Sequence, residues 1–382
     1  MRIAFYAPLK PPDHPVASGD RTMARLLIAA LRRAGHEVEV AARLRSRDGD
    51  GDPVRQERLR AIGDRLAERF IRRYAQEPAR RPDLWFTYHL YYKAPDWLGP
   101  RVAEALSIPY VVAEASAADK RRTGPWRLGH AALVAALGRA DAVIGLNSAD
   151  REAVLPLLAA PERCHALPPF IDIAPFARAA GVRAAHRAAL AADHGIDPTI
   201  PLLVALAMMR DGDKLESYRL LAAALTRNIA APWQLLVIGD GPARDAVEAA
   251  FAPCADRVTW LGRVEGASLA GILAASDLLA WPAVNEAYGM ALLEGQAAGL
   301  PVIAGASGGV GDIVVDGITG RLTPPGDAAA FATALGELLA APDLCRALGA
   351  AAASRAAAEH DIAGAARRLD RILRAVVEGN RS

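Results

Sequence analysis

The sequence has few cysteines and no excess of charge of either sign. Its three cysteines, Cys164, Cys254 and Cys345, are scattered without the spacing of a zinc site or a disulfide framework. Such sparse cysteine use fits a reducing compartment, and we expect a cytoplasmic protein. The formal net charge is only +2, so the overall charge does not indicate nucleic-acid binding.

Long hydrophobic runs are also missing. No stretch of roughly 18 apolar residues occurs, so the sequence predicts no membrane span. The opening MRIAFYAPLKPP has a short apolar run that ends at Lys10, which predicts a first strand and not a signal peptide. With 382 residues, 52% of them hydrophobic and 23% charged, the chain has the composition of a globular protein and the length of two ordinary domains.

Short apolar runs alternate with stretches of helical spacing along the whole chain. Several runs are almost continuously apolar, as parallel strands covered on both faces are. The alternation predicts an α/β protein with doubly wound sheets, and two sheets of about five strands are favoured over a single large one. The strand candidates are 2–7, 37–42, 83–88, 110–115, 141–146, 201–208, 233–239, 257–262, 277–282 and 301–305.

The rhythm of strands and helices breaks near LPPFIDIAPFARAAG, residues 167–181, where prolines accumulate. A helical stretch follows, and a fresh strand begins at Leu202. The last helix is amphipathic and must pack on another part of the protein. We therefore expect a first domain at 1–175, a linker at 176–198, a second domain at 199–358 and a C-terminal helix within 359–382.

The most informative segment is NEAYGMALLEGQAAGLPVIAG, residues 285–305, in which two acids lie among apolar and small residues. We expect a helix from about Tyr288 to Ala298 that begins at the carboxyl end of a strand, where ligands bind in open α/β sheets. The first amides of such a helix attract anions. From spacing alone, Glu294 either pairs with a structural arginine while Glu286 complements the helix dipole, or both acids face a ligand.

This segment, continued by ASGGVGDIVVDGITGRLTPPGD, closely resembles the signature of family 4 of the retaining glycosyltransferases, the glycosyl transferases group 1. The resemblance implies the GT-B fold: two Rossmann-like doubly wound parallel-sheet domains that face a cleft, with the C-terminal helix crossing back to the first domain. It also implies transfer of a sugar from a nucleoside diphosphate sugar to a hydroxyl acceptor, which would be a glycan, a lipid-linked molecule or a small molecule. The expected context is synthesis of cell-envelope glycans or exopolysaccharide.

In the family motif, the first glutamate faces the donor sugar and the second holds the ribose hydroxyls of the nucleotide. The resemblance therefore implies a catalytic role for Glu286 and a donor-binding role for Glu294. The neighbouring donor-binding residues implied by the motif, several of them through the backbone beside the diphosphate, are Tyr288, Gly289, Met290 and Ala291. The loop LGRVEG adds Arg263 and Val264, which the resemblance places near the nucleobase.

MMRDGDK, residues 208–214, follows the first strand of the second domain. Arg210 and Lys214 match in type the cations with which the family neutralises the diphosphate as the sugar leaves, although the usual flanking glycines are absent. A solvated charged loop is the alternative. The pair Gly239 and Gly241 alone could suggest a dinucleotide site, but Arg244 stands where the third glycine of that fingerprint belongs.

Three residues of the first domain complete the predicted site. Gly19 begins a segment that resembles the family's phosphate-approaching loop, with Asp20 where a second glycine is common. Glu114 stands where the family often has a histidine, and it either orients a substrate or forms a structural ion pair. His89 follows another strand and is expected on the acceptor side, although a lone histidine can equally be structural.

No metal or cofactor is implied beyond the donor itself, and the sequences DGD at 48–50 and 211–213 are interpreted as polar loops. A basic amphipathic helix is expected within 55–81, either as a peripheral contact with the cytoplasmic membrane face or as a solvated outer helix. Three rival functions stay open. They are a nucleotide-sugar epimerase, a non-catalytic GT-B protein that binds nucleotide sugar, and an oxidoreductase dependent on NAD, for which the glycine fingerprint is incomplete.

Overall fold

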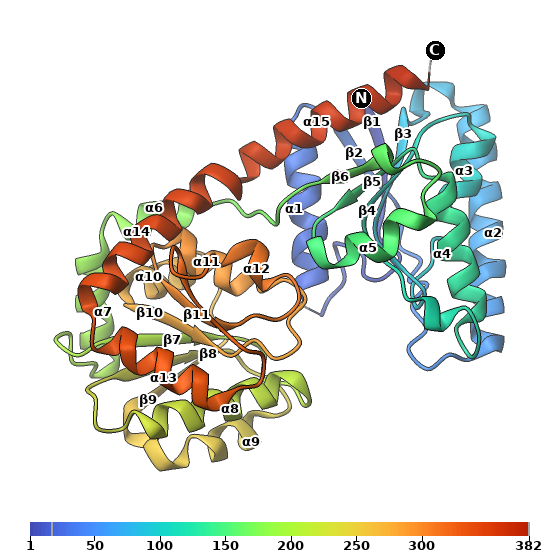
Figure 1. Ribbon diagram of the computed structural model, residues 1–382. Coiled ribbons are helices and arrows are strands. Elements are labelled where there is room, and N and C mark those ends of the chain that lie inside the picture. The colour runs from blue at the N-terminus through green and yellow to red at the C-terminus, as the bar shows by residue number, and fades with distance from the viewer. Residues whose placement is uncertain (17, 381–382) are drawn as a thin grey trace. The chain divides into compact units, whose positions relative to one another are not determined.

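The structure, a computed structural model, describes residues 1–16 and 18–380 and divides into two compact units (Figure 1). Unit 1 consists of Met1–Pro168 together with the chain after Asp361, and unit 2 is Pro169–Asp361. The segment expected as a linker is instead part of unit 2. Its helices α6 (Ala174–Ala180) and α7 (Arg183–His194) pack against α10 (Gly266–Ala275), because they carry apolar residues that need covering.

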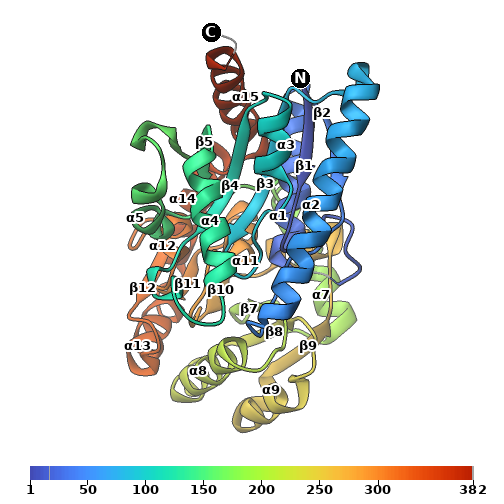
Figure 2. The same ribbon diagram turned by 90° about the vertical axis from the view of Figure 1, so that its right-hand side faces the viewer.

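Unit 1 is built on a sheet of six parallel strands in the order β2-β1-β3-β4-β5-β6. Helices α2, α3 and α4 cover one face of this sheet, and α1 and α15 cover the other (Figures 1 and 2). The strands are β1 (Arg2–Tyr6), β2 (Glu37–Ala42), β3 (Leu84–Tyr91), β4 (Tyr110–Ser116), β5 (Ala142–Gly145) and β6 (Cys164–Ala166). The helices are α1 (Gly19–Arg33), α2 (Pro53–Gln76), α3 (Gly99–Ala105), α4 (Arg127–Arg139), α5 (Arg151–Val154) and α15 (Ile362–Gly379).

Unit 2 has a second sheet of six parallel strands, in the order β12-β11-β10-β7-β8-β9. Its strands are β7 (Leu202–Leu206), β8 (Gln234–Ile238), β9 (Val258–Gly262), β10 (Leu278–Trp281), β11 (Val302–Gly305) and β12 (Gly320–Thr323). Besides α6, α7 and α10, its helices are α8 (Asp213–Arg227), α9 (Arg244–Ala250), α11 (Met290–Ala297), α12 (Val310–Ile313), α13 (Ala328–Leu339) and α14 (Pro342–Glu359). The predicted class, doubly wound α/β with parallel sheets, is confirmed.

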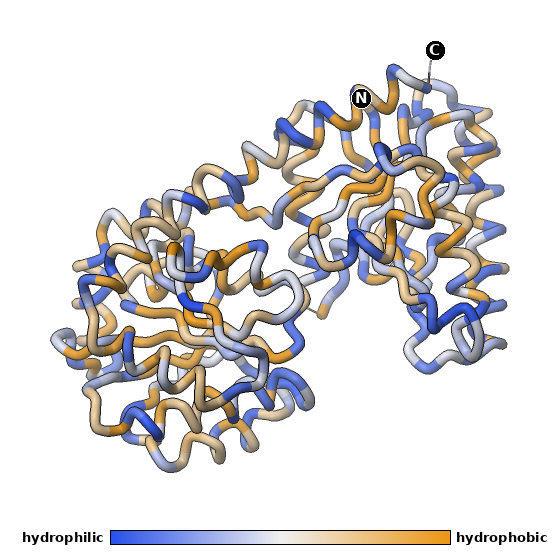
Figure 3. Tube along the Cα trace, viewed as in Figure 1, coloured by the Kyte–Doolittle hydropathy of each residue, from blue (hydrophilic) through white to orange (hydrophobic). Residues whose placement is uncertain are grey.

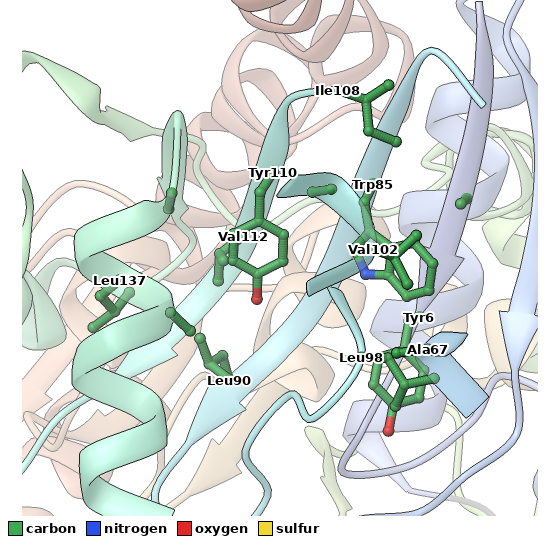
Figure 4. Packing of buried hydrophobic residues seen from close by; sticks show 14 of the residues in the cluster. Tyr6, Ala67, Trp85, Leu90, Leu98, Val102, Ile108, Tyr110, Val112 and Leu137 are labelled. Atoms are coloured by element: carbon green, nitrogen blue, oxygen red, sulfur yellow. The ribbon is translucent and has the colours of Figure 1, made fainter. Parts of the chain in front are cut away.

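The strands and the helix faces that pack on them form the core of each unit, and hydrophilic residues gather in the loops at the strand ends (Figure 3). In unit 1 the large rings of Trp85, Tyr110 and Tyr6 are completely buried and pack among aliphatic side chains (Figure 4). Their polar atoms are satisfied: the Tyr110 hydroxyl donates to buried Asp96 at 3.1 Å, and the Tyr6 hydroxyl donates to the Leu44 carbonyl at 2.8 Å. The well-packed core therefore holds the strand ends, and the loops that follow them, in fixed positions.

The final helix α15 packs on α1 within unit 1. Its buried face includes Leu369 and Leu373, and its Asp370 lies 3.2 Å from Nε2 of buried His36 in the turn before β2. An amphipathic helix covers its apolar stripe in this way. The C-terminal helix therefore returns to the first domain, as the family resemblance implied.

The basic amphipathic stretch expected at 55–81 is α2 followed by a short 3₁₀ turn, Pro78–Arg80. Helix α2 packs on α3 and α4, with Ala67 and Tyr74 fully buried, so much of its apolar stripe is used inside unit 1. Among the residues that the structure describes, no single helix has the length and apolar composition needed to cross a membrane. Helices α13 and α14 pass that test only as a pair bent by 101°.

Candidate functional site

The sheet of unit 2 reverses its winding direction between β7 and β10. From β7 the chain proceeds to β8 and β9 on one side, and β10, β11 and β12 follow on the other. In open α/β sheets, ligands bind outside the carboxyl ends of the strands at such a switch point, because the loops there run apart. The loop after β7 carries Arg210 and leads to Lys214, and the loop after β10 carries Glu286.

The structure brings Lys214 and Glu286 together although 72 residues separate them. The Lys214 ammonium donates a hydrogen bond to Oε2 of Glu286, and Nε1 of Trp281 contacts the same oxygen at 3.4 Å. The ammonium also lies 5.4 Å from the centroid of the Trp281 ring. The ion pair with Lys214 and the indole of Trp281, at the end of β10, therefore fix the orientation of the Glu286 carboxylate.

The loop between β10 and α11 has a strained backbone that hydrogen bonds keep in place. Ala283 and Asn285 have φ values of 55° and 49°, in the left-handed region that costs non-glycine residues roughly 1–3 kcal/mol each. The side-chain amide of Asn285 donates to the Asp213 carboxylate at 2.9 Å, and the backbone amide of Val284 donates to the Ser217 hydroxyl at 3.0 Å. Because both acceptors lie on α8, these bonds fix the β10 loop to the β7 side of the site.

A second loop, after β11, supports Glu286 from the other side. The Glu286 amide donates to the Ser307 hydroxyl at 3.2 Å, and the Gly309 amide donates to the Ala287 carbonyl at 3.0 Å. Gly308 has a φ of 51°, and a Cβ there would lie 2.1 Å from the Glu286 carbonyl oxygen. Only glycine permits this approach, which explains the glycine at position 308 in the segment ASGGVG.

Helix α11 begins at Met290, two residues later than the sequence suggested. Gly289 is its N-cap with a φ of 76°, and its side chain, a single hydrogen, leaves the helix without a side-chain cap among the described residues. The first amides of a helix have no acceptor within the helix. In α11 these free amides are the backbone N–H groups of Met290 and Ala291. An uncapped positive helix end at the switch point is suited to bind an anion such as a phosphate.

Glu294 lies on the second turn of α11 and is largely surrounded by protein. Burial raises the pKa of its carboxyl to about 7. Within residues 1–16 and 18–380, no hydrogen bond or ion pair to this carboxylate is found. The interpretation in which Glu294 pairs with a structural arginine is therefore wrong. A desolvated carboxylate that lacks a protein partner is costly, and a ligand with hydroxyl donors would relieve that cost.

Arg210 is exposed at the tip of the loop after β7, and no acid pairs with its guanidinium in the described part of the chain. The loop itself is fixed, since the Met209 side chain is buried and the Leu215 amide donates to the Arg210 carbonyl at 3.0 Å. The flanking glycines that the family usually has are replaced here by this buried anchor. The guanidinium is therefore available to a ligand.

The glycine pair after β8 turns out to serve this same loop. A Cβ at Gly239 would lie 1.8 Å from the Ala207 carbonyl oxygen, and one at Gly241 would lie 2.2 Å from that of Met209. The two glycines thus let the loops after β7 and β8 run against each other. This packing explains the motif without a dinucleotide.

The remaining residues predicted for unit 2 are less closely connected. Arg263 follows edge strand β9, is exposed, and forms an ion pair with Glu265 at 2.6 Å. Val264 beside it is half-buried, as is Tyr288 in the loop before α11. Within the described part of unit 2, Arg263 forms no hydrogen bond or ion pair with Lys214 or Glu286.

In unit 1 the corresponding switch point lies between β1 and β3, and it holds a cluster of charged side chains. Nδ1 of His89 is 3.1 Å from Asp20 in the first turn of α1 and 3.5 Å from buried Glu114 on β4. Burial lowers the pKa of His89, but the carboxylates of Glu114, Asp20 and Asp150 outweigh it and raise the pKa to about 9. His89 is therefore a cation at neutral pH.

The backbone at this cluster is strained in two neighbouring strands. His89 has a φ of 59° and Glu114 a φ of 58°, and the pairing of β3 with β4 continues on both sides of them. Non-glycine residues in this conformation concentrate at functional sites. Gly19, by contrast, is the exposed first residue of α1, and a Cβ there would contact no described residue within 4 Å.

Several residues of the candidate site were not predicted from the sequence. Trp281, Asp213, Ser217, Ser307 and Gly308 all hold Glu286 or its loop. Each is close in sequence to a predicted residue, but none has a pattern that shows which partner it contacts. Among the described residues, no group of three or more histidine, cysteine, aspartate or glutamate side chains could hold a metal ion.

Comparison with known proteins agrees with this geometry. The family model described as "Glycosyl transferases group 1" matches residues 201–341, and that described as "Glycosyl transferase 4-like domain" matches residues 18–169. The chain belongs to the glycosyl transferases group 1 family. The resemblance found in the sequence is thereby confirmed, and the matched segments include every residue predicted for the site.

Curated relatives of this group 1 chain include the D-inositol 3-phosphate glycosyltransferase of Mycolicibacterium gilvum. It is 34% identical over 189 residues, which are 47% of this chain and 40% of that protein. The match with the enzyme of the same name from Nocardia farcinica covers 58% of this chain and 50% of the relative, at 30% identity. The chain thus spans about half the length, or less, of the curated relatives it matches first.

Among solved structures, the sucrose-phosphate synthase of Thermosynechococcus elongatus has a TM-score of 0.72 at 22% identity and covers 99% of both chains. HepE of Anabaena, solved in complex with UDP, has a TM-score of 0.74 at 17% identity and covers 98% of this chain and 100% of its own. At these identities the likeness shows the fold alone. The fold is GT-B, as expected from the sequence.

Proposed function

We propose that this protein is a retaining glycosyltransferase that transfers a sugar from a nucleoside diphosphate sugar to a hydroxyl acceptor. The observation that carries the proposal is the carboxylate of Glu294, which lies without a protein partner in the described structure on the helix whose first amides are uncapped. A carboxylate accepts hydrogen bonds from two neighbouring hydroxyls, such as those of a ribose. The free amides at the start of a helix donate hydrogen bonds to the phosphates that follow the ribose.

The cations at the switch point supply the second part of the argument. When the sugar leaves, negative charge grows on the diphosphate, and fixed positive groups stabilise that charge. Arg210 has no acid partner in the described structure and is our candidate for the main contribution. Lys214 is paired with Glu286 and would share its charge between this carboxylate and the phosphate.

In the proposed reaction, the bond between the anomeric carbon and the diphosphate oxygen breaks, and a bond to the acceptor oxygen forms on the same face of the sugar. The acceptor hydroxyl gives its proton to the departing phosphate, so the products are a glycoside and a nucleoside diphosphate. Glu286 orients the hydroxyls of the sugar and forms no covalent bond to it. The donor-facing roles of Gly289, Tyr288, Arg263, Val264 and Gly19 belong to the same proposal.

The acceptor and the setting are proposed from the family relationship. Unit 1 would bind the acceptor, a glycan, a lipid-linked molecule or a small molecule, with His89 and Glu114 as the charged groups beside it. The protein would act in the cytoplasm, with α2 as a peripheral contact to the membrane, in the synthesis of cell-envelope glycans or exopolysaccharide. No cofactor besides the donor is proposed.

The test is a steady-state assay of the full chain with a panel of nucleoside diphosphate sugars, in which release of the nucleoside diphosphate is measured with and without acceptor mixtures. Arg210→Gln should lower kcat by about a hundredfold, as loss of one charge-stabilising donor does. Arg219→Gln, on the exposed side of α8, is the matched control and should keep wild-type turnover.

Full activity in Arg210→Gln would contradict the role of this cation. Conversion of the donor sugar to an isomer without any acceptor would indicate an epimerase instead. Tight donor binding with neither hydrolysis nor transfer would indicate a binding protein, and the proposed reaction would then be wrong.

A further inference from the structure

A group of rings and cations in unit 1 takes no part in the site described above. We call Tyr92, Lys93, Arg121 and Trp126 the cation–aromatic cluster. The Lys93 ammonium lies 4.8 Å and the Arg121 guanidinium 4.7 Å from the centroid of the Trp126 ring, and both also lie over Tyr92, at 5.9 and 5.3 Å. The two rings meet edge to face at 5.8 Å.

The cluster joins two loops at the carboxyl edge of the first sheet. Tyr92 and Lys93 directly follow β3, and the other two residues lie in the hydrophilic loop between β4 and α4 (Figure 3). Two successive ring contacts connect this cluster to His89: His89 to Tyr91 at 5.3 Å, and Tyr91 to Tyr92 at 5.5 Å. Carboxyl edges of parallel strands are where ligands bind in such sheets.

The positive charge of the cluster is not neutralised within the described structure. Neither Lys93 nor Arg121 forms an ion pair with an acid there, and Nε of Arg121 is buried without a hydrogen-bond partner. Two cations held beside the same rings repel each other, and an unsatisfied buried donor is costly. Cation–π contacts lower these costs only in part, whereas a bound anion would satisfy both groups.

One acid that contacts the cluster, Asp48, does not serve as that anion. Its backbone carbonyl accepts from Nε1 of Trp126 at 3.4 Å. Its buried carboxylate accepts instead from the Gln56 amide at 2.9 Å and from the Asp50 amide at 3.2 Å. The rings and the guanidinium therefore form a preorganised surface on which no acid of the described structure supplies the counter-ion.

We propose that the cation–aromatic cluster binds a phosphate group of the acceptor, at the end remote from the hydroxyl that reacts. A planar guanidinium is suited to two parallel hydrogen bonds to phosphate oxygens, and an ammonium adds a point charge. The tyrosine and tryptophan rings offer apolar faces to the sugar or polyol that carries the phosphate. The proposal rests on the proposed function, and it narrows the acceptor to a phosphorylated saccharide or polyol.

Isothermal titration of the full chain with glucose 6-phosphate, with glucose as the uncharged probe, tests this assignment. Glucose 6-phosphate should bind and glucose should bind far more weakly. Arg121→Gln should weaken the affinity for glucose 6-phosphate by about tenfold or more, because a charge-assisted contact is lost. Lys93→Gln should act in the same direction. Arg122→Gln removes the neighbouring exposed arginine, which lies outside the ring contacts, and should change the affinity less than about twofold.

The result that would overturn the proposal is an unchanged affinity in Arg121→Gln, or equal losses in Arg121→Gln and Arg122→Gln, since equal losses mean unspecific attraction. Vesicles with and without phosphatidylglycerol separate the two sources of a phosphate. Vesicle binding that depends on Arg121 assigns the phosphate to a lipid, and dependence on Arg121 for glucose 6-phosphate alone assigns it to a soluble acceptor.

Binding of nucleoside diphosphates in the same titrations distinguishes this inference from the proposed function. Arg121→Gln should leave nucleoside diphosphate affinity unchanged, because the residues assigned to these ligands are Gly19 and residues of unit 2, none of them in the cluster. This result also verifies that the variant is folded. If nucleoside diphosphates bind but glucose 6-phosphate is insensitive to Arg121, only the inference about the acceptor is wrong. If no nucleoside diphosphate binds, the proposed function itself is wrong.

Discussion

At the scale of single residues, the side chain with the clearest consequence is Glu294. Its carboxyl has a pKa raised to about 7 because burial removes water from the charged form. The carboxylate offers both of its oxygens as acceptors to the hydroxyls of a ribose, whereas in the neutral acid one of these oxygens carries a proton. Ligand binding through these hydroxyls therefore favours the ionised form and should lower the pKa of Glu294.

This linkage predicts that nucleoside diphosphate affinity rises as the pH increases through about 7. Below that pH the free protein holds a proton on Glu294, and binding must release it, which weakens affinity. Glu294→Gln should bind about tenfold more weakly at pH 8 and show little pH dependence between about pH 6 and 8. Titration calorimetry at several pH values measures both, and a wild-type affinity without pH dependence would contradict the ribose assignment.

Single residues also show where reasoning from the sequence ends. Residue type and spacing drew attention to Glu286 and Glu294, and the family resemblance implied their roles and those of Arg210 and Lys214. The contact between Lys214 and Glu286 joins two loops that are 72 residues apart in sequence, so no local pattern shows it. The same holds for Glu294, which has no arginine partner in the described structure. Pattern analysis gives the residues of a strand end but not the direction of their side chains.

At the scale of elements, the loops around Glu286 depend on close backbone approaches. Gly308→Ala should displace the loop after β11, because its Cβ would lie 2.1 Å from the Glu286 carbonyl oxygen at a φ of 51°. We expect a loss of roughly 1–3 kcal/mol in unfolding free energy and a marked loss of donor affinity. Chemical denaturation and nucleotide titration measure these effects.

Gly311→Ala is the matched control, three residues further on in α12, where an added Cβ meets nothing within 4 Å. Alanine favours helix, so this variant should keep or slightly raise stability and bind nucleotide as the wild type does. Equal behaviour of the two variants would show that the approach of Gly308 to Glu286 does not determine the geometry of the site.

The elements that the sequence did not predict are the shortest ones. All ten strand candidates correspond to strands, but edge strands β6 and β12 were missed because three or four residues such as CHA and GRLT carry no periodic pattern. Helix α11 was expected two residues too early, since its start depends on the left-handed conformation of Gly289. Long apolar runs are predictable, whereas edges and caps depend on neighbours.

At the scale of the whole molecule, two crossings of the chain connect the units, after Pro168 and after Asp361. The two crossing segments contact each other at the boundary of unit 2. Ile171 forms a parallel β-bridge with Asp361, and Nδ1 of His360 lies 2.6 Å from the Pro169 carbonyl oxygen. The division after Pro168 lies in the proline-containing stretch 167–181, and the linker expected at 176–198 is two packed helices. Local composition could not show that their apolar faces are covered by α10.

The return of α15 to unit 1 makes a prediction for the stability of that unit. Leu373 is completely buried on the face of α15 that packs there, so Leu373→Ala should lower the free energy of unfolding by about 2–5 kcal/mol. Arg371→Ala, on the exposed side of the same helix, should change it by less than about 0.5 kcal/mol. Thermal unfolding followed by calorimetry compares the two, and similar melting temperatures would show that the helix is not docked.

The most direct test of the central claim is a crystal structure of the full chain with a bound nucleoside diphosphate. We predict ribose hydroxyls within about 2.6–3.2 Å of the Glu294 carboxylate, and phosphate oxygens at the first amides of α11 and near the Arg210 guanidinium. A nucleotide bound elsewhere, with the carboxylate of Glu294 facing no hydroxyl, would contradict the account.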